Sequence, residues 1–430
     1  MSNFAKLAAG AIIAASAAST AMADLYFPSL SYRTGAYGAG GGPYADGYMD
    51  YFNLLNERDG GLGGVRAVVE ECETAYDTQK GVECYEATKG NNPMVYNPLS
   101  TGITYQLIPK VQADDLNLYT PGYGRTSAAN GQVFENVFNF PANYWNGASA
   151  IINHLLEING GSLEGKKIAL VYHNSAYGKE PIGTLEALSE KHGFDLSLLP
   201  VDHPGQEQKS QWLQVRRDRP DNVILYGWGV MNPVALQEAA NIRYPMDQVL
   251  GIWWSGNEID VEPVGAGADG YKSANFHAPG SDFPVFDEVR EYLVDTGKAA
   301  SDGQNIGTVP YNKGFYAAML MAESALKAQE IHGTPDITPQ QFRDGMEALE
   351  MTEARMEELG MPGFGPEFSV SCENHGGPGR VAIQQYDAEA DEFTLITDFI
   401  ESDMEVIQPL IDQDSEAFAS ESGIEPRDCG

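Results

Sequence analysis

The sequence is poor in positive charge. Its 430 residues hold 26 lysines and arginines against 61 aspartates and glutamates, which gives a formal net charge of −35. Nucleic acids and anionic membrane surfaces would repel such a chain, so we expect neither as a partner. The acidity itself is typical of a solvated surface that keeps a protein soluble.

Long apolar segments are missing as well. Beyond the N-terminus no segment approaches the roughly 18 uninterrupted apolar residues of a membrane span, so we expect no direct insertion into a membrane. The N-terminus carries one cation, Lys6, then a short alanine-rich apolar stretch over 7–18 and small residues ahead of Asp24. This pattern predicts a secretory signal peptide over 1–23. Because no cysteine stands near the cleavage site to carry a lipid, we expect a free protein of a Gram-negative periplasm.

Cysteine is scarce. The chain has four, Cys72, Cys84, Cys372 and Cys429, and none has the CxxC spacing of a zinc or redox motif. Four cysteines allow three pairings, and in an oxidising compartment bridges are expected. We expect Cys72 to pair with Cys84, which is close in sequence, and Cys372 to pair with Cys429, which would fix the C-terminal tail.

The motifs of common enzymes are absent or incomplete. Gly40, Gly42 and Ala45 formally fit the GxGxxA fingerprint of dinucleotide binding, but Pro43 falls in the first helical turn and the acidic residue of the fingerprint is misplaced. Residues 160–166 fit GxxxxGK but precede a strand, so they cannot present helix N–H groups to phosphate. No GxSxG or HExxH motif occurs. We therefore expect no enzyme, no cofactor and no metal, and keep a secreted α/β hydrolase as an alternative.

Short β-branched runs alternate with helix-length segments over most of the chain, which is typical of parallel sheets with crossover helices. One series of strands and helices covers about 25–120, and a second runs from Tyr144 to about 254. Helices follow, and then an antiparallel pair of strands within 381–399. The sequence therefore predicts an α/β fold with two sheet domains, between which the chain crosses several times.

Polar and aromatic residues follow the predicted strands at their carboxyl ends, where open α/β sheets bind ligands. These residues are Arg33, Thr34, Tyr37, Ser100, Thr101, Gly122, Tyr123, Gly124 and Arg125 in the first series, and Tyr172, His173, Tyr177, Tyr226, Trp228, Trp253, Trp254 and Ser255 in the second. Hydroxyl and glycine N–H groups at helix starts suit an anion, and rings supply apolar walls. If LGIWW is an extended strand, Trp253 faces the cleft and Trp254 points the opposite way, since side chains alternate.

Several of these segments stand together in a familiar order: TGAYGAGGGPYADGYMDYF, NPLSTGITY, LYTPGYG and KKIALVYHNSAYGKEP. In this the chain resembles periplasmic substrate-binding proteins of ABC transporters, of the branched-chain amino acid (leucine/isoleucine/valine-binding) family, over nearly all of its length. The resemblance implies a type I periplasmic binding protein fold, in which two doubly wound parallel-sheet lobes are joined by three crossover segments and close on a ligand by a hinge. Residues 24–139 and 275–382 would form the N-terminal lobe, and 140–274 and 383–430 the C-terminal lobe.

The resemblance also implies site residues. Ser100 falls where the family's serine holds the ligand carboxylate, Tyr177 falls on its cleft tyrosine, and Gly122 falls where the backbone binds the ligand. Gly124 replaces a threonine that helps to hold the carboxylate and ammonium groups of an amino acid. The acidic partner of that ammonium group has its nearest counterpart in Glu258. The glycine-dense segment is expected to border the cleft through free backbone N–H groups, with Tyr37 projecting into it.

The expected function is that of the solute-binding component of an ABC import system. It would capture a small organic solute by hinge closure and deliver it, as a monomer, to a membrane permease. The departures from the amino acid pattern, together with Arg33, Arg125, Tyr123, Trp228 and Trp253, suggest a carboxylated solute, with an aromatic body as one option. A branched-chain or other amino acid is the alternative, and a sensory ligand-binding module would need a membrane-anchored partner.

Overall fold

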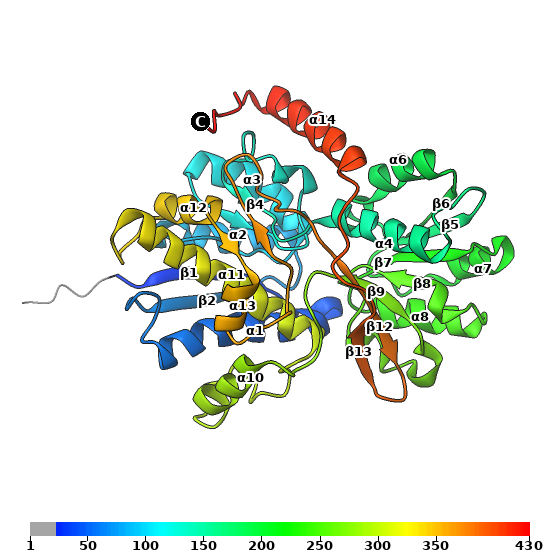
Figure 1. Ribbon diagram of the computed structural model, residues 1–430, viewed down its shortest axis with the longest axis horizontal. Helices are drawn as coiled ribbons and strands as arrows, with labels where there is room; N and C mark the ends of the chain where they lie inside the picture. The colour runs from blue at the N-terminus through cyan, green and yellow to red at the C-terminus, as the bar shows by residue number, and fades with distance from the viewer. Residues whose placement is uncertain (1–22) are drawn as a thin grey trace, which may run out of the picture.

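The computed structural model describes residues 23–430, so the predicted signal peptide lies outside the described residues except for its last position. The chain forms two α/β lobes side by side (Figure 1). Both contain parallel strands with helices packed around them, which confirms the α/β class that the alternation of strands and helices predicts. Within the described residues no helix is long and apolar enough to cross a membrane.

The first lobe is built on parallel pairs of strands. β1 (Leu25–Ser31) pairs with β2 (Ala67–Glu73) and is bridged to 93–97, which is bridged in turn to β3 (Leu118–Tyr119) beside β4 (Val137–Phe138). Every residue of β1 is buried, as expected for a strand inside a parallel sheet. The longer helices of this lobe are α1 (Gly38–Arg58), α2 (Thr78–Thr88), α3 (Thr101–Asp114), α11 (Val309–His332) and α12 (Pro339–Glu347).

α11 is the central helix of the first lobe. Residues 309–325 are buried without interruption, which marks a helix surrounded by protein on all sides. α1 packs along it so closely that a Cβ atom on Gly47 would overlap the backbone of Tyr311, and one on Gly314 would overlap the backbone of Tyr44. The two glycines therefore fix how near the two helix axes lie.

The second lobe contains a seven-stranded sheet in the order β13-β12-β9-β8-β7-β5-β6. Its strands are β5 (Lys167–His173), β6 (Asp195–Val201), β7 (Asn222–Tyr226), β8 (Val249–Gly251), β9 (Lys272–Asn275), β12 (Ala382–Asp387) and β13 (Glu392–Leu395). β5 to β9 are parallel, whereas β12 and β13 are antiparallel to their neighbours. The antiparallel pair predicted near the C-terminus is thus confirmed, and it extends the sheet of the second lobe.

Helices cover the second sheet, and several short elements complete the first lobe. The helices are α4 (Tyr144–Ile158), α5 (Ala176–Lys179), α6 (Ile182–His192), α7 (Lys209–Asp218), α8 (Met231–Asn241) and α9 (Glu258–Val261). The short elements are α10 (Pro284–Val289), α13 (Glu353–Glu358), β10 (Glu350–Met351) and β11 (Phe368–Ser369), and α10 and α13 pack on α1 and α11 of the first lobe. The chain passes between the lobes after β4, after β9 and before β12.

The C-terminal helix makes a further crossing that differs from the sequence-based assignment of 383–430 to one lobe. α14 (Met404–Ser422) begins on the second lobe, where the N–H of Asp403 donates to Ser149 Oγ at 2.7 Å. It ends on the first lobe, where Phe418 stacks on Phe134 with ring centroids 4.7 Å apart (Figure 1). The apolar face of an amphipathic helix indicates that the helix packs against protein, but the sequence pattern does not identify the lobe that it contacts.

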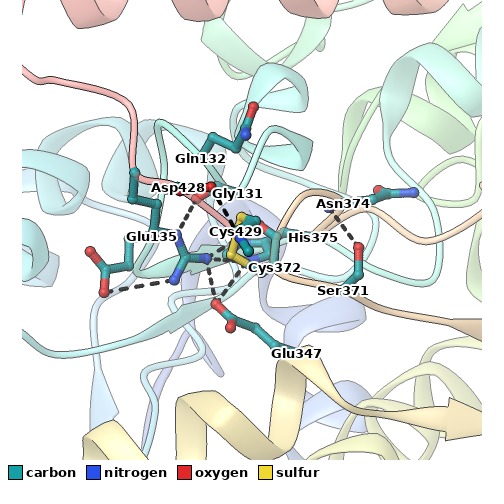
Figure 2. Close-up of a disulfide and its surroundings, with 12 residues drawn as sticks. Gly131, Gln132, Glu135, Glu347, Ser371, Cys372, Asn374, His375, Asp428 and Cys429 are labelled. Atoms are coloured by element: carbon teal, nitrogen blue, oxygen red, sulfur yellow. Dashed lines mark hydrogen bonds and ion pairs between the residues drawn. A yellow bond between two sulfur atoms is a disulfide. The ribbon is translucent and has the colours of Figure 1, made fainter.

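Both expected disulfides are present, Cys72 to Cys84 and Cys372 to Cys429. The second one ties the tail after α14 to the first lobe, next to His375 (Figure 2). The tail is therefore covalently held at the end of the crossing that α14 makes.

We expect the Cys372→Ser/Cys429→Ser variant to lose about 4 kcal/mol of unfolding free energy in the chain-entropy model, because its cysteines are 57 residues apart. The Cys72→Ser/Cys84→Ser variant, whose cysteines are 12 residues apart, should lose about 3 kcal/mol. Denaturant unfolding of both variants beside the unchanged protein measures the two losses. The reverse order of losses would show that the polar contacts of the tail, and not its bridge, hold it in place.

Candidate ligand-binding site

A narrow cavity lies between the two lobes. Its volume is about 10 Å³, which is close to the space of one water molecule, so this structure shows the lobes closed on each other. A larger solute needs the lobes further apart than they stand here. The lining residues are Tyr32, Tyr76, Leu99, Ser100, Thr101 and Tyr123 from the first lobe, and Tyr144, Tyr177, Trp228 and Trp254 from the second. The cavity is thus walled by five tyrosines, two tryptophans, one leucine and two hydroxyl residues, without a charged side chain.

The N-terminus of α3 forms the polar end of the cavity. Ser100 is its N-cap, and Ser100 Oγ accepts a hydrogen bond from the N–H of Ile103 at 3.3 Å. Thr101 Oγ1 accepts one from the N–H of Gly124 at 3.2 Å. Each hydroxyl uses its oxygen in these bonds and keeps its hydrogen to donate. Together with the first N–H groups of a helix, these two donors suit a carboxylate.

The aromatic rings form the other walls. Trp228 stands at 84° to Tyr32 and at 70° to Trp254, so neighbouring rings meet nearly at right angles, as the walls of a box do. Burial raises the pKa of Tyr32 and of Tyr177 well above the usual value of a phenol, so both are neutral. The hydroxyl of Tyr177 donates to the carbonyl of Gly227 at 2.8 Å, away from the cavity. The walls therefore offer ring surface and no charge.

One carbonyl of the first lobe holds two indoles of the second. The oxygen of Gly122 accepts from Trp253 Nε1 at 2.7 Å and from Trp254 Nε1 at 2.9 Å. The position expected to bind a ligand through its backbone is thus used within the protein. A carbonyl oxygen has two lone pairs, and both are engaged here.

The predicted orientation of the two adjacent tryptophans is wrong. Trp254 lines the cavity, whereas Trp253 lies behind the wall with no exposed surface and stacks on Tyr144 at a centroid distance of 5.9 Å. β8 ends at Gly251, and both tryptophans belong to the turn that follows it. The alternation of side chains along a strand therefore does not apply to them.

The glycine-dense segment is the contact surface between the lobes. Its glycines form the first turns of α1, not a loop, and a Cβ atom on Gly40 would lie 2.5 Å from Trp228 Cη2. On the opposite side, a Cβ atom on Gly229 would lie 2.5 Å from the carbonyl oxygen of Ala36, which accepts from the N–H of Val230 at 3.0 Å. The glycines therefore serve by lacking side chains, which lets the lobes meet.

The remaining predicted residues lie outside the cavity lining. Arg33 forms ion pairs with Asp46 at 2.7 Å and with Glu71 at 2.6 Å, so its charge is already paired. The carboxylate of Glu258 accepts from the N–H of Val309 at 3.0 and 3.1 Å and thereby caps α11. This side chain does not stand where it would meet an ammonium group in the cavity.

Ten of the strand-end residues are predicted to bind the solute, and the structure places half of them in the lining of the cavity. Those in the lining are Ser100, Thr101, Tyr123, Tyr177 and Trp228, and those outside it are Arg33, Tyr37, Gly122, Gly124 and Trp253. The ten residues do not include Tyr32, Tyr76, Leu99 and Tyr144, nor Trp254, whose side chain was expected to point away from the cleft. Tyr32 and Tyr76 follow β1 and β2 directly, so the strand-end rule could have found them.

Two side-chain contacts close the mouth of the cleft. Tyr37 Oη lies 3.0 Å from His173 Nε2, and Tyr105 donates to Glu180. A larger cavity of about 640 Å³ at this mouth shares Tyr76 with the inner cavity. The inner cavity thus lies behind a wide entrance that these contacts border.

The two contacts titrate in opposite senses. Burial, to which the charge of His203 adds, lowers the pKa of His173 from 6.5 to about 4. Burial raises the pKa of Glu180 from 4.5 to about 7. If both groups regain their ordinary pKa values when the lobes part, closure expels a proton from His173 and takes one up at Glu180.

We therefore expect opposite pH responses from two variants. As pH falls from 6.5 to 4, His173 makes closure less favourable, and as pH falls from 7 to 4.5, Glu180 makes it more favourable. His173→Gln should bind solute more tightly at about pH 5 than at about pH 7.5, and Glu180→Gln less tightly. Calorimetric affinities over this range measure the difference. If both variants kept the pH profile of the unchanged protein, neither contact would take part in closure.

Gly40→Ala should prevent full closure, because its methyl group would meet Trp228. Overpacking of this kind costs about 1 to 3 kcal/mol, so solute affinity should fall roughly 5- to 150-fold. Gly42→Ala is the matched control, since it lies in the same helix and a Cβ atom there meets nothing within 4 Å. Calorimetry on both variants tests this, and equal affinities would show that the helix start does not limit closure.

Comparisons with known proteins agree with this architecture. Residues 25–391 match the family model of a periplasmic binding protein. The chain is 39% identical to a solved structure described as an ABC transporter permease from Pseudomonas fluorescens group, with a TM-score of 0.88 over 95% of this chain and 99% of that one. Comparison with curated protein sequences finds no match.

Two more distant structures share the fold. A branched-chain amino acid ABC transporter from Thermus thermophilus, with bound valine, is 18% identical and has a TM-score of 0.75, covering 90% of this chain and 98% of that one. A solute-binding protein of an ABC transporter from R. palustris, in complex with benzoate, is 15% identical and has a TM-score of 0.68 over 89% and 98%. The chain therefore belongs to the periplasmic binding protein family.

Proposed function

We propose that the protein is the solute-binding component of an ABC import system and works in the periplasm after export by its signal peptide. It captures a small organic solute between its lobes and delivers it unchanged to a membrane permease. The observation that carries this proposal is the interlobe cavity, which has a polar end at α3 and uncharged aromatic walls. Its lining holds no acidic or basic side chain that could act as a general acid or base.

The polar end favours a carboxylated solute. Ser100 and Thr101 each keep a hydroxyl hydrogen to donate at the start of a helix of 14 residues, where the helix dipole also favours an anion. The rings enclose the remainder of the solute, whether aromatic or aliphatic.

An α-amino acid fits this cavity less well. The ammonium group of such a ligand needs acceptors, but the lining has no carboxylate and the oxygen of Gly122 already accepts two hydrogen bonds. A buried ammonium group without partners is costly. The relatives that bind valine and benzoate show that the fold itself does not decide between these ligand classes.

Ser100→Ala should weaken the binding of a carboxylate by roughly 1.5 to 3 kcal/mol, the range for a hydrogen bond to a charged group. The probe is the tightest ligand in a thermal-shift screen of aliphatic acids, aromatic acids and amino acids, and calorimetry measures its affinity. Because Ser100 also caps α3, the control is Thr338→Ala, which removes the cap of α12 away from the cavity. Unchanged affinity in Ser100→Ala, or equal losses in both variants, would remove the α3 terminus from the site.

A further inference from the structure

The cavity offers ring faces but few acceptors for a donor on the solute. The carbonyl of Gly122 is engaged twice, and the carboxylate of Glu258 is bound to the start of α11. The hydroxyl of Tyr123 is held by Asn97 and by the N–H of Leu99. An N–H group of the solute would meet only tyrosine hydroxyls there, such as those of Tyr32, Tyr76 and Tyr144, and a positively charged N–H group would find no carboxylate. The charged part of the solute among the rings is therefore one without N–H donors.

The types of aromatic residue that line the cavity indicate the charge of the solute. The chain contains 17 phenylalanines, yet all the aromatic side chains that line the cavity are tyrosine or tryptophan, and leucine occurs there once. Phenylalanine, leucine and isoleucine would wall a purely apolar solute equally well. Tryptophan is the strongest binder of cations through its ring face, and desolvated sites strengthen that attraction. The choice of electron-rich rings therefore indicates a positive charge in the bound solute.

A quaternary ammonium group meets both conditions, because it carries a positive charge and has no N–H. We propose that the solute is a betaine, in which a carboxylate bound at the N-terminus of α3 is joined to a quaternary ammonium group held against the ring faces of Tyr32, Tyr177 and Trp228. This inference rests on the proposed function and names the class of solute for the same cavity. A betaine accounts for two observations together: Ser100 is present to bind a carboxylate, and the lining has no acidic side chain to bind an ammonium group.

The side chain of Lys313 lies against the outer side of this cage. Its Nζ lies 4.6 Å from the ring centroid of Trp254 and donates to the carbonyl of Trp253 at 2.6 Å. It is fully buried behind the wall; burial lowers the pKa of Lys313 to about 7, against the charges of Glu258 and Asp260, which raise this pKa. The face of Trp254 is therefore already used by a cation, and the ring of Trp228 is the tryptophan face left for the solute.

The test compares solutes of the same shape that differ only in charge. Trimethylglycine and 3,3-dimethylbutanoate share a carboxylate and a trimethyl group, but a carbon replaces the nitrogen in the second. 4-(Trimethylammonio)butanoate and 5,5-dimethylhexanoate form a longer pair. In calorimetry at one ionic strength we expect the betaine of at least one pair to bind about tenfold more tightly than its isostere.

The remaining outcomes of this comparison distinguish a failure of the betaine inference from a failure of the proposed function. Equal or tighter binding of both isosteres, which lack the positive charge, would overturn the betaine inference, and so would benzoate or valine as the tightest ligand. In the isostere and benzoate outcomes a carboxylate still binds, so the proposed carboxylate site stands. No detectable binding of any of these carboxylates would overturn both.

Variants of the cage give a second readout. Trp228→Leu should abolish most of the preference for the betaine over its isostere, whereas Trp145→Leu, outside the lining, should keep it. If Trp228→Leu does not fold, replacement of all five tryptophans by an electron-poor fluorinated tryptophan keeps their shape and still weakens the attraction. A preference that survives both changes would overturn the role of the rings.

Discussion

The double hydrogen bond to the carbonyl of Gly122 is the interaction on which the binding cavity depends. It joins the lobes, it turns the ring of Trp254 into the cavity, and it occupies an acceptor that would otherwise face a solute. Only glycine fits at this position, since its φ is +73° and a Cβ atom would lie 2.5 Å from Phe276 and 2.8 Å from Trp253 Nε1. A single backbone position thus sets the closure geometry and the chemistry of the cavity together.

The glycines at the start of α1 also permit a close approach between the lobes because they have no side chains. Each glycine inside a helix costs about 1 kcal/mol relative to alanine, so a helix start with several of them is intrinsically weak. The packing of α1 against the buried helix α11 offsets that cost. Because Gly40 has no side chain, the backbone of α1 can contact Trp228 when the lobes close, and no side chain has to move aside. The start of α1 is therefore intrinsically less stable as a helix at the place where the second lobe must approach it closely.

The sequence predicted the fold class and five of the ten residues that line the interlobe cavity, and the misses have physical causes. The strand-end rule found Ser100, Tyr177 and Trp228 because it depends only on where strands stop. It failed for Trp253 and Trp254 because the strand ends at Gly251, three residues before the end of the apolar run, and side chains in a turn do not alternate. The disulfides followed from spacing and compartment, whereas the lobe that receives α14 depends on tertiary contacts that no local pattern contains.

The charge of the whole protein bears on the kind of solute it can collect. A net charge of −35 creates a negative potential around the surface, and that field acts on the net charge of an approaching molecule. A simple carboxylate is repelled at distances up to about 8 Å at physiological ionic strength, whereas a zwitterion with no net charge is not. Within the cavity, the N-terminus of α3 faces the carboxylate of such a solute and the ring faces meet its positive end. A solute that carries both charges therefore avoids the repulsion outside and finds a partner for each charge inside.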